Sequence, residues 1–238
     1  MTKAHLIFMP GMLCDAAAWR SQIDGLRDLC AVEVSSFGVL DNFDAMADMV
    51  LANAPEKFAL AGHSMGGRVG LEIYRRAPDR VTHLGLFATD YRGHPSDEAR
   101  AAEKARRSGT LARIEAEGME GFARFWVTQV VARENLENAI LVEDIVAMMA
   151  RHSPDVAAAQ TLAGLTRRDQ GDVLAKVTCP TLFCAGRKDM LRPVEVHADM
   201  AARVAGSELV IAEHSAHMVA MEEAGTVTTA MRAWLSKQ

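Results

Sequence analysis

Short apolar runs alternate with longer amphipathic segments along most of the chain. The apolar runs are nearly continuous and no longer than six residues, which is typical of strands buried on both faces of a parallel sheet. They fall at His5–Met9, Ala31–Ser36, Phe58–Gly62, His83–Ala88, Thr181–Ala185 and Glu208–Ala212. Between them the spacing predicts helices at Ala16–Leu29, Phe43–Ala54, Met65–Ala77, Pro193–Val204 and Met218–Ser236, with Pro193 in a first helical turn. This alternation predicts an α/β fold with a doubly wound, mostly parallel sheet.

The alternation stops between residues 91 and 168. No run in this stretch resembles a strand, and the pattern instead predicts helices at Asp97–Arg107, Thr110–Glu117, Met119–Arg133, Asn135–Arg151 and Asp155–Leu165. Ser96 and Ser153 stand before two of these helices as candidate N-caps. We therefore expect residues 1–90 and 169–238 to form the core of the fold and residues 91–168 to form an inserted helical cap.

Composition and charge exclude several classes of protein. Hydrophobic residues make up 50% of the chain and charged residues 24%, close to the average for globular proteins. A net charge of -5 leaves no positive footprint for nucleic acid or an anionic membrane. The apolar runs are too short to span a bilayer or to form the core of a signal peptide. The four cysteines lack metal-binding spacing, so we expect a cytoplasmic protein with free thiols and no metal.

The segment around Ser64 has the pattern of a nucleophilic serine. Residues 58–67 read Phe-Ala-Leu-Ala-Gly-His-Ser-Met-Gly-Gly, so an apolar strand runs into a G-x-S-x-G pattern that opens a helix. A turn this tight has no room for side chains two residues either side of the serine, and Gly62 and Gly66 remove them. The hydroxyl is then expected at the carboxyl edge of the sheet, where the helix N-terminus favours developing negative charge.

A serine nucleophile needs a base, and the base needs an acid that orients it. Folds built around this turn place the three in the chain order serine, acid, histidine. The predicted strand at Thr181–Ala185 leads into a loop with Asp189, and the one at Glu208–Ala212 leads into a loop with His217. All three side chains therefore follow the carboxyl ends of strands, which meet at one edge of the sheet. The sequence predicts a catalytic triad of Ser64, Asp189 and His217.

With these motifs the chain resembles the α/β-hydrolase superfamily over nearly its whole length. The likeness rests on the opening strand and glycine loop, the GHSMGG turn, the CPTLFCAGRKDMLRP acid loop and the last histidine loop. Within the superfamily the chain is similar to small serine esterases with a helical cap, such as the pimeloyl-ester carboxylesterases. The resemblance implies an oxyanion hole made by the backbone N–H groups of Met12 and Met65, and no cofactor or metal. Pro10 stands where the family usually has histidine, and Ala216 where it usually has glycine.

Alternatives remain open for two members of the triad. Asp90 follows the predicted strand at His83–Ala88, a position from which some members of the superfamily supply the acid. His214 lies three residues before His217, although His217 is the one next to the final helix. His63, beside the serine, is expected to be a packing residue of the turn.

Two further groups of residues are candidates for substrate binding. An adaptable apolar acyl pocket is expected to include Leu13, Trp126, Met190 and Met218, with general core filling as the alternative for the methionines. Trp126 belongs to an apolar stripe with Phe122 and Phe125 on the predicted cap. A basic cluster on the cap can attract a carboxylate, coenzyme A or an acyl carrier protein, with a solvated helix face as the alternative; it comprises Arg100, Lys104, Arg106 and Arg107.

Together these patterns predict a serine hydrolase that cleaves a carboxylic ester or related acyl compound through an acyl-serine intermediate. Its expected partner is a small-molecule acyl substrate, with an acyl carrier protein or coenzyme A ester as a weaker alternative. The same triad also serves acyl transfer, C–C bond hydrolysis and perhydrolysis. A non-catalytic ligand-binding member of the fold is the alternative from a different functional class.

Overall fold

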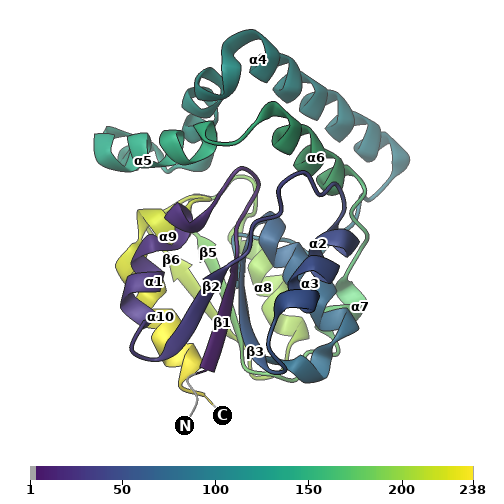
Figure 1. The fold of residues 1–238 in the computed structure, drawn as a ribbon, viewed down its shortest axis with the longest axis vertical. Helices are drawn as coiled ribbons and strands as arrows, with labels where there is room; N and C mark the ends of the chain where they lie inside the picture. Colours follow the sequence, from purple (N-terminus) through teal and green to yellow (C-terminus); the bar gives the residue numbers. More distant parts are fainter. Residues whose placement is uncertain (1–3, 238) are drawn as a thin grey trace.

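A six-stranded sheet lies at the centre of the computed structural model, which describes residues 4–237 (Figure 1). Its strands follow the order β2-β1-β3-β4-β5-β6, and every neighbouring pair is parallel. The strands are β1 (Ala4–Met9), β2 (Cys30–Val34), β3 (Phe58–His63), β4 (Val81–Phe87), β5 (Thr181–Gly186) and β6 (Glu208–Ala212). Each begins and ends within two residues of its prediction, and the predicted doubly wound α/β fold is confirmed.

Helices cover both faces of the sheet because alternate strand residues point to opposite sides. One face lies under α1 (Arg20–Leu26), α9 (Val219–Glu222) and α10 (Ala224–Leu235), and the other under α2 (Phe43–Asn53), α3 (Met65–Arg76) and α8 (Val194–Arg203) (Figure 1). In β1, Leu6 and Phe8 join the hydrophobic cluster of the first face, and Ile7 and Met9 join that of the second. The buried part of β1, from Leu6 to Met9, is therefore apolar on both faces, which explains its continuous apolar sequence.

Outside residues 91–168, three predicted helices differ from those observed. The expected helix at Ala16–Leu29 is a 3₁₀ turn, η1 (Ala16–Trp19), followed by α1. The expected helix at Met218–Ser236 is interrupted at Glu223, whose φ of -127° and ψ of 55° end α9 before α10 begins. Pro193 is the N-cap of α8 and lies outside its first turn, because its ψ of 156° is extended. Neither the charge pattern nor the hydrophobic periodicity of the sequence indicates these breaks.

The segment between β4 and β5 is helical, with most of its length in α4 (Asp97–Val130), α5 (Ala139–Ala150) and α6 (Pro154–Leu165). The predicted N-caps are confirmed: Ser96 accepts from the N–H of Ala99, and Ser153 from that of Val156. The expected break near Gly109 is absent. The expected break between Glu117 and Met119 is confirmed as a kink at Gly118, where a φ of 73° is accessible to glycine without strain.

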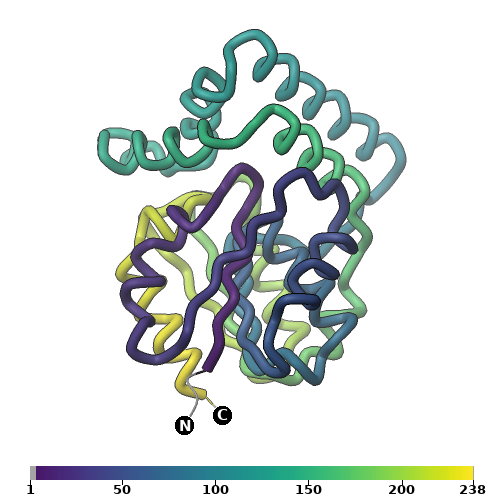
Figure 2. Tube along the Cα trace, viewed as in Figure 1, coloured from purple at the N-terminus to yellow at the C-terminus, as the bar shows by residue number. Residues whose placement is uncertain are grey.

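These three helices lie together over the edge of the sheet where the parallel strands end (Figure 1). The chain enters and leaves them on the same side of the molecule (Figure 2), where the N–H of Gln170 donates to the carbonyl of Tyr91 at 2.9 Å. The expected helix at Asn135–Arg151 is divided at Asn138 into a 3₁₀ turn, η3 (Arg133–Glu137), and α5. Shorter elements that the sequence did not predict are η2 (Pro78–Arg80) and α7 (Gly171–Leu174). Within residues 4–237, no helix has the length and apolarity needed to cross a membrane.

Candidate active site

Ser64 occupies a sharp turn between β3 and α3. Its φ of 52° and ψ of -110° lie in a region that side chains rarely adopt. A Cβ atom added at Gly62 would lie 2.4 Å from the carbonyl oxygen of Gly66, and one at Gly66 would lie 2.0 Å from that of Met9. Both positions therefore require glycine, as the sequence pattern indicates. The turn is anchored by the N–H of Ser64, which donates to Phe87 at 2.8 Å.

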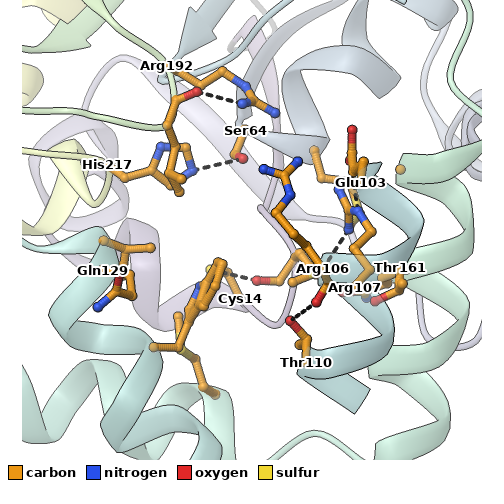
Figure 3. A pocket seen from close by; sticks show the side chains of 18 of the residues that line it. Cys14, Ser64, Glu103, Arg106, Arg107, Thr110, Gln129, Thr161, Arg192 and His217 are labelled. Atoms are coloured by element: carbon orange, nitrogen blue, oxygen red, sulfur yellow. Dashed lines mark hydrogen bonds and ion pairs between the residues drawn. The ribbon is translucent and has the colours of Figure 1, made fainter. Parts of the chain in front are cut away.

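The three side chains predicted as a triad form one continuous line of hydrogen bonds. The Nε2 atom of His217 lies 2.9 Å from the Oγ of Ser64 (Figure 3). Its Nδ1 lies 2.7 Å from Oδ2 of Asp189. The other oxygen of Asp189 accepts the backbone N–H groups of Leu191 at 2.8 Å and Arg192 at 2.9 Å. Because the carboxylate can only accept, Nδ1 donates to it and leaves Nε2 free to accept the serine proton.

The carboxyl group of Asp189 is held in its ionised form. Burial acts to raise its pKa, but His217 and the N–H groups of Leu191 and Arg192 outweigh burial, so the pKa lies below its ordinary value. The buried carboxylate can therefore orient the imidazole and stabilise its protonated form.

The two alternatives for the triad occupy other positions. Asp90 is bound to Arg92, whose N–H, Nε and Nη2 lie 2.9, 3.0 and 3.1 Å from its carboxylate oxygens. His214 lies on an exposed loop, where its backbone bonds to Glu223 and Asn135. Within residues 4–237, neither side chain forms a hydrogen bond to Ser64 or His217.

Two backbone N–H groups near the serine are available to an oxyanion. Among the described residues, the N–H groups of Met12 and Met65 have no hydrogen-bond acceptor in the protein. The loop that carries Met12 is held from both sides. A Cβ at Gly11 would approach Nδ1 of His63 to 2.7 Å, and the N–H of Leu13 donates to Oε1 of Gln160 on α6 at 2.8 Å.

His63 has a role that its sequence position did not reveal. The ring is buried, and burial, followed by the nearby His217, lowers its pKa to about 3. Its Nε2 lies 2.8 Å from the backbone carbonyl of His217, so the neutral ring donates this hydrogen bond. His63 therefore joins the serine turn, the loop of Met12 and the loop of His217.

Glu222 is a second supporting residue that the sequence analysis missed. Its carboxylate accepts from the N–H of Ala132 at 2.7 Å, Nδ2 of Asn135 at 2.9 Å and the N–H of Ala216 at 3.0 Å. Burial raises the pKa of this carboxyl group. The contacts tie the loop of His217 to the chain that follows α4, and no sequence motif marks them.

A cavity of about 850 Å³ opens beside Ser64 and His217. In Figure 3 these two residues lie on the core side, and Arg106 and Thr110 face them from α4. Of the predicted pocket residues, Trp126, Met190 and Met218 line the cavity. Leu13 does not, because its side chain is fully buried in the core. Phe125 also lines it, whereas Phe122 is fully buried and stacks on Trp126 with a ring separation of 5.7 Å.

Neither a cysteine nucleophile nor a metal-binding cluster is found beside this cavity in the described part of the chain. Cys14 borders it, but burial, together with the charge of Asp15, raises the pKa of the thiol to about 12, so the reactive thiolate is absent at neutral pH. Within residues 4–237, the cysteines form no disulfide bond. Within the described part of the chain, no cluster of His, Cys, Asp and Glu has the arrangement needed to hold a metal ion.

Known proteins that are similar to this chain are mainly hydrolases. A family model described as "Serine aminopeptidase, S33" matches residues 32–224. A pimeloyl-[acyl-carrier protein] methyl ester esterase from Aliivibrio salmonicida is 29% identical, over 90% of this chain and 85% of that protein. The enzyme of the same name from Proteus mirabilis is 30% identical, with coverages of 90% and 86%. A thermophilic esterase from Thermogutta terrifontis, solved with malate bound, superposes with a TM-score of 0.86 at 27% identity, covering 98% of this chain and 90% of that one.

Proposed function

The chain belongs to the serine aminopeptidase S33 family of α/β hydrolases and hydrolyses ester bonds, and we propose that Ser64, His217 and Asp189 carry out this reaction. The observation that supports the assignment is the continuous hydrogen-bonded line from Ser64 Oγ through the imidazole to the Asp189 carboxylate, beside an open cavity. These are the nucleophile, base and orienting acid that acyl transfer to serine requires.

In the first half of the reaction, the oxygen of Ser64 attacks the ester carbonyl while Nε2 of His217 takes the hydroxyl proton. The negative charge that develops on the carbonyl oxygen is stabilised by the N–H groups of Met12 and Met65, which have no acceptor among residues 4–237. Asp189 stabilises the imidazolium. The tetrahedral intermediate then collapses, and His217 delivers its proton to the departing alcohol, which leaves an acyl group on Ser64.

In the second half, water replaces the alcohol. His217 removes a proton from the water as it attacks the acyl-serine, and the same N–H groups stabilise the second oxyanion. Collapse of this intermediate releases the carboxylic acid, and the proton on His217 returns to Ser64. The residues present supply every proton transfer in the cycle.

We propose that the substrate is a small acyl ester, in which the acyl chain lies in the cavity under the helices of residues 91–168. Under this proposal those residues act as a cap. Several relatives are named for a methyl ester of pimeloyl-acyl carrier protein, which supports a methyl ester, carried by such a protein or free, as the substrate class. A cytoplasmic location remains part of the proposal and is supported by the free thiols of Cys14, Cys179 and Cys184.

The nucleophile is tested with a fluorophosphonate probe and the substitution Ser64→Ala. The probe is expected to label the wild-type chain at Ser64 and to miss the variant, because the hydroxyl makes the covalent bond. Loss of the nucleophile in serine hydrolases costs on the order of 10⁴ to 10⁶ in kcat. Cys14→Ala is the matched control and is expected to retain labelling. Labelling of Ser64→Ala at another residue would contradict the assignment.

Turnover of a series of p-nitrophenyl esters distinguishes an esterase from a ligand-binding member of the fold. Many cycles per molecule, with release of both acid and alcohol, are expected. A single burst of p-nitrophenol equal to the protein concentration would instead indicate a chain that is acylated once and does not turn over.

A further inference from the structure

Positive charge is concentrated in the cavity of a chain whose net charge is -5. One carboxylate, Glu103, contributes to the cavity wall. Six guanidinium groups do so: Arg68, Arg106, Arg107, Arg113, Arg167 and Arg192. Because a cavity with low-dielectric walls focuses the field of its charges, this imbalance attracts anions to the site.

The acidic side chains nearby do not neutralise all of these arginines. Glu103 is already bound by two of them, since its oxygens lie 2.8 Å from Nε of Arg107 and 2.7 Å from Nη2 of Arg167. Arg113 is paired with Glu117 at 2.7 Å. These pairs leave three arginines of the cavity wall to be accounted for.

The remaining arginines of the cavity wall are Arg68, Arg106 and Arg192. Among residues 4–237, Arg106 and Arg192 have no carboxylate within ion-pair distance, and the nearest to Arg68 is Asp90 at 3.9 Å. Asp90 is held more tightly by Arg92. Arg68 is buried, with only 4% of the residue exposed, and its Nη1 atom has no hydrogen-bond partner in the described part of the chain.

The three arginines surround the reacting groups from different elements. Arg68 lies one helical turn after Ser64 on α3, and Arg192 follows Asp189, to which its N–H donates. Figure 3 shows Arg192 on the core side with Ser64 and Arg106 facing them from α4. Burial, and then the charge of Arg192, lowers the pKa of Arg68 to about 9. The repulsion between Arg68 and Arg192 therefore has a cost, which an anion bound beside them would offset.

We propose that Arg68, Arg106 and Arg192 form a subsite for an anionic group at the far end of the acyl chain, so that the preferred substrate is an ester whose acyl part ends in a carboxylate or a phosphate. This inference rests on the proposed ester hydrolysis at Ser64. Guanidinium groups suit the task because their planar N–H donors match both kinds of anion and remain charged near neutral pH.

The test compares methyl esters of matched acyl length by pH-stat. One set ends in a methyl group, one in a carboxylate as in monomethyl adipate, and one in a phosphate. The wild-type chain is expected to have a kcat/KM about ten- to a hundredfold higher for at least one of the anionic esters than for the neutral ester, as charge-assisted hydrogen bonds imply. The preferred ester shows whether the subsite binds a carboxylate or a phosphate.

Two substitutions and one control test whether these arginines cause the preference for anionic esters. Arg106→Gln and Arg192→Gln are each expected to lower the ratio of anionic to neutral kcat/KM by about tenfold, mainly through KM for the anionic ester. Lys104→Gln removes an exposed charge from the same helix outside the cavity wall and is expected to leave the ratio unchanged. Melting temperatures of all three variants report whether the fold is retained.

A wild-type ratio near one would overturn the subsite, as would an equal fall of the ratio in Lys104→Gln. Failure of the proposed function gives a different result. In that case the neutral ester would not be hydrolysed either, and the fluorophosphonate would not label Ser64. Hydrolysis of the neutral ester without any preference for an anion therefore contradicts the subsite alone.

Discussion

The pairing of His217 with one particular carboxylate gives the most direct test at the scale of single residues. Asp189→Asn keeps the shape of the side chain but removes the acceptor that fixes the tautomer of His217, and in a related triad this change costs about 10⁴ in kcat. Asp90→Asn is the matched control, since the Asp90 carboxylate binds Arg92, and it is expected to cost far less. Steady-state kinetics on one neutral ester decide between them. A larger loss of kcat in Asp90→Asn would identify Asp90, which follows β4, as the acid of the triad.

At the scale of elements, α4 is expected to limit the length of the acyl chain through Trp126. The side chain lines the cavity and stacks on the buried Phe122, so Trp126→Ala enlarges the pocket. An apolar wall discriminates by about 1 to 3 kcal/mol per methylene, so relative kcat/KM should shift toward longer esters by about ten- to a hundredfold. Ile140→Ala, on the exposed side of α5, is the control. A lowered melting temperature with an unchanged chain-length profile would mean that Trp126 only packs the helices.

The elements that the sequence predicts well are those whose signal is local. The strands and the turn at Ser64 follow from apolar runs and from glycines that steric contact requires, so β6 was predicted at its observed bounds. The break at Glu223 could not be predicted in this way, because it follows from hydrogen bonds between distant segments. Glu222 accepts from Ala132, 90 positions away, and Glu223 accepts from the N–H of His214.

The residues of the candidate site likewise divide into those that a local motif predicts and those that depend on contacts between distant segments. Ser64, Asp189 and His217 each follow the end of a strand with a recognisable motif, and the structure brings them together. The loop of Met12 depends on Gln160, which is 147 residues from its partner Leu13. The arginines of the cavity likewise come from the core and from α4, so only the folded arrangement reveals that their charges share one space.

At the scale of the whole molecule, buried histidines are expected to make stability depend on pH. The pKa of His63 is lowered from 6.5 to about 3 by burial and by His217. Between these values the unfolded chain binds a proton that the folded chain does not, so the free energy of unfolding falls as the pH drops from 6.5 toward 3. His197, whose pKa burial lowers to about 4, adds to the trend. Asp189, with its lowered pKa, adds to it only below about 3.8.

Urea unfolding between pH 7.5 and pH 4 measures this effect. His63→Gln keeps a donor for the carbonyl of His217 but removes the titration, so the dependence of unfolding free energy on pH should weaken by up to about 1.4 kcal/mol per pH unit. His214→Gln, on the exposed loop, is the control and should retain the wild-type dependence. Identical curves for wild type and His63→Gln would mean that the buried ring is protonated without cost.

The backbone of Ser64 also bears on how the chain can evolve. A residue held at a φ of 52° and a ψ of -110° costs on the order of 1 to 3 kcal/mol relative to a relaxed conformation, a sizeable share of a typical protein's stability. Glycine would relieve much of this strain and would remove the hydroxyl at the same time. Selection for thermal stability alone would therefore favour losing the serine. Its presence at this position indicates that selection has maintained the reaction at the expense of robustness.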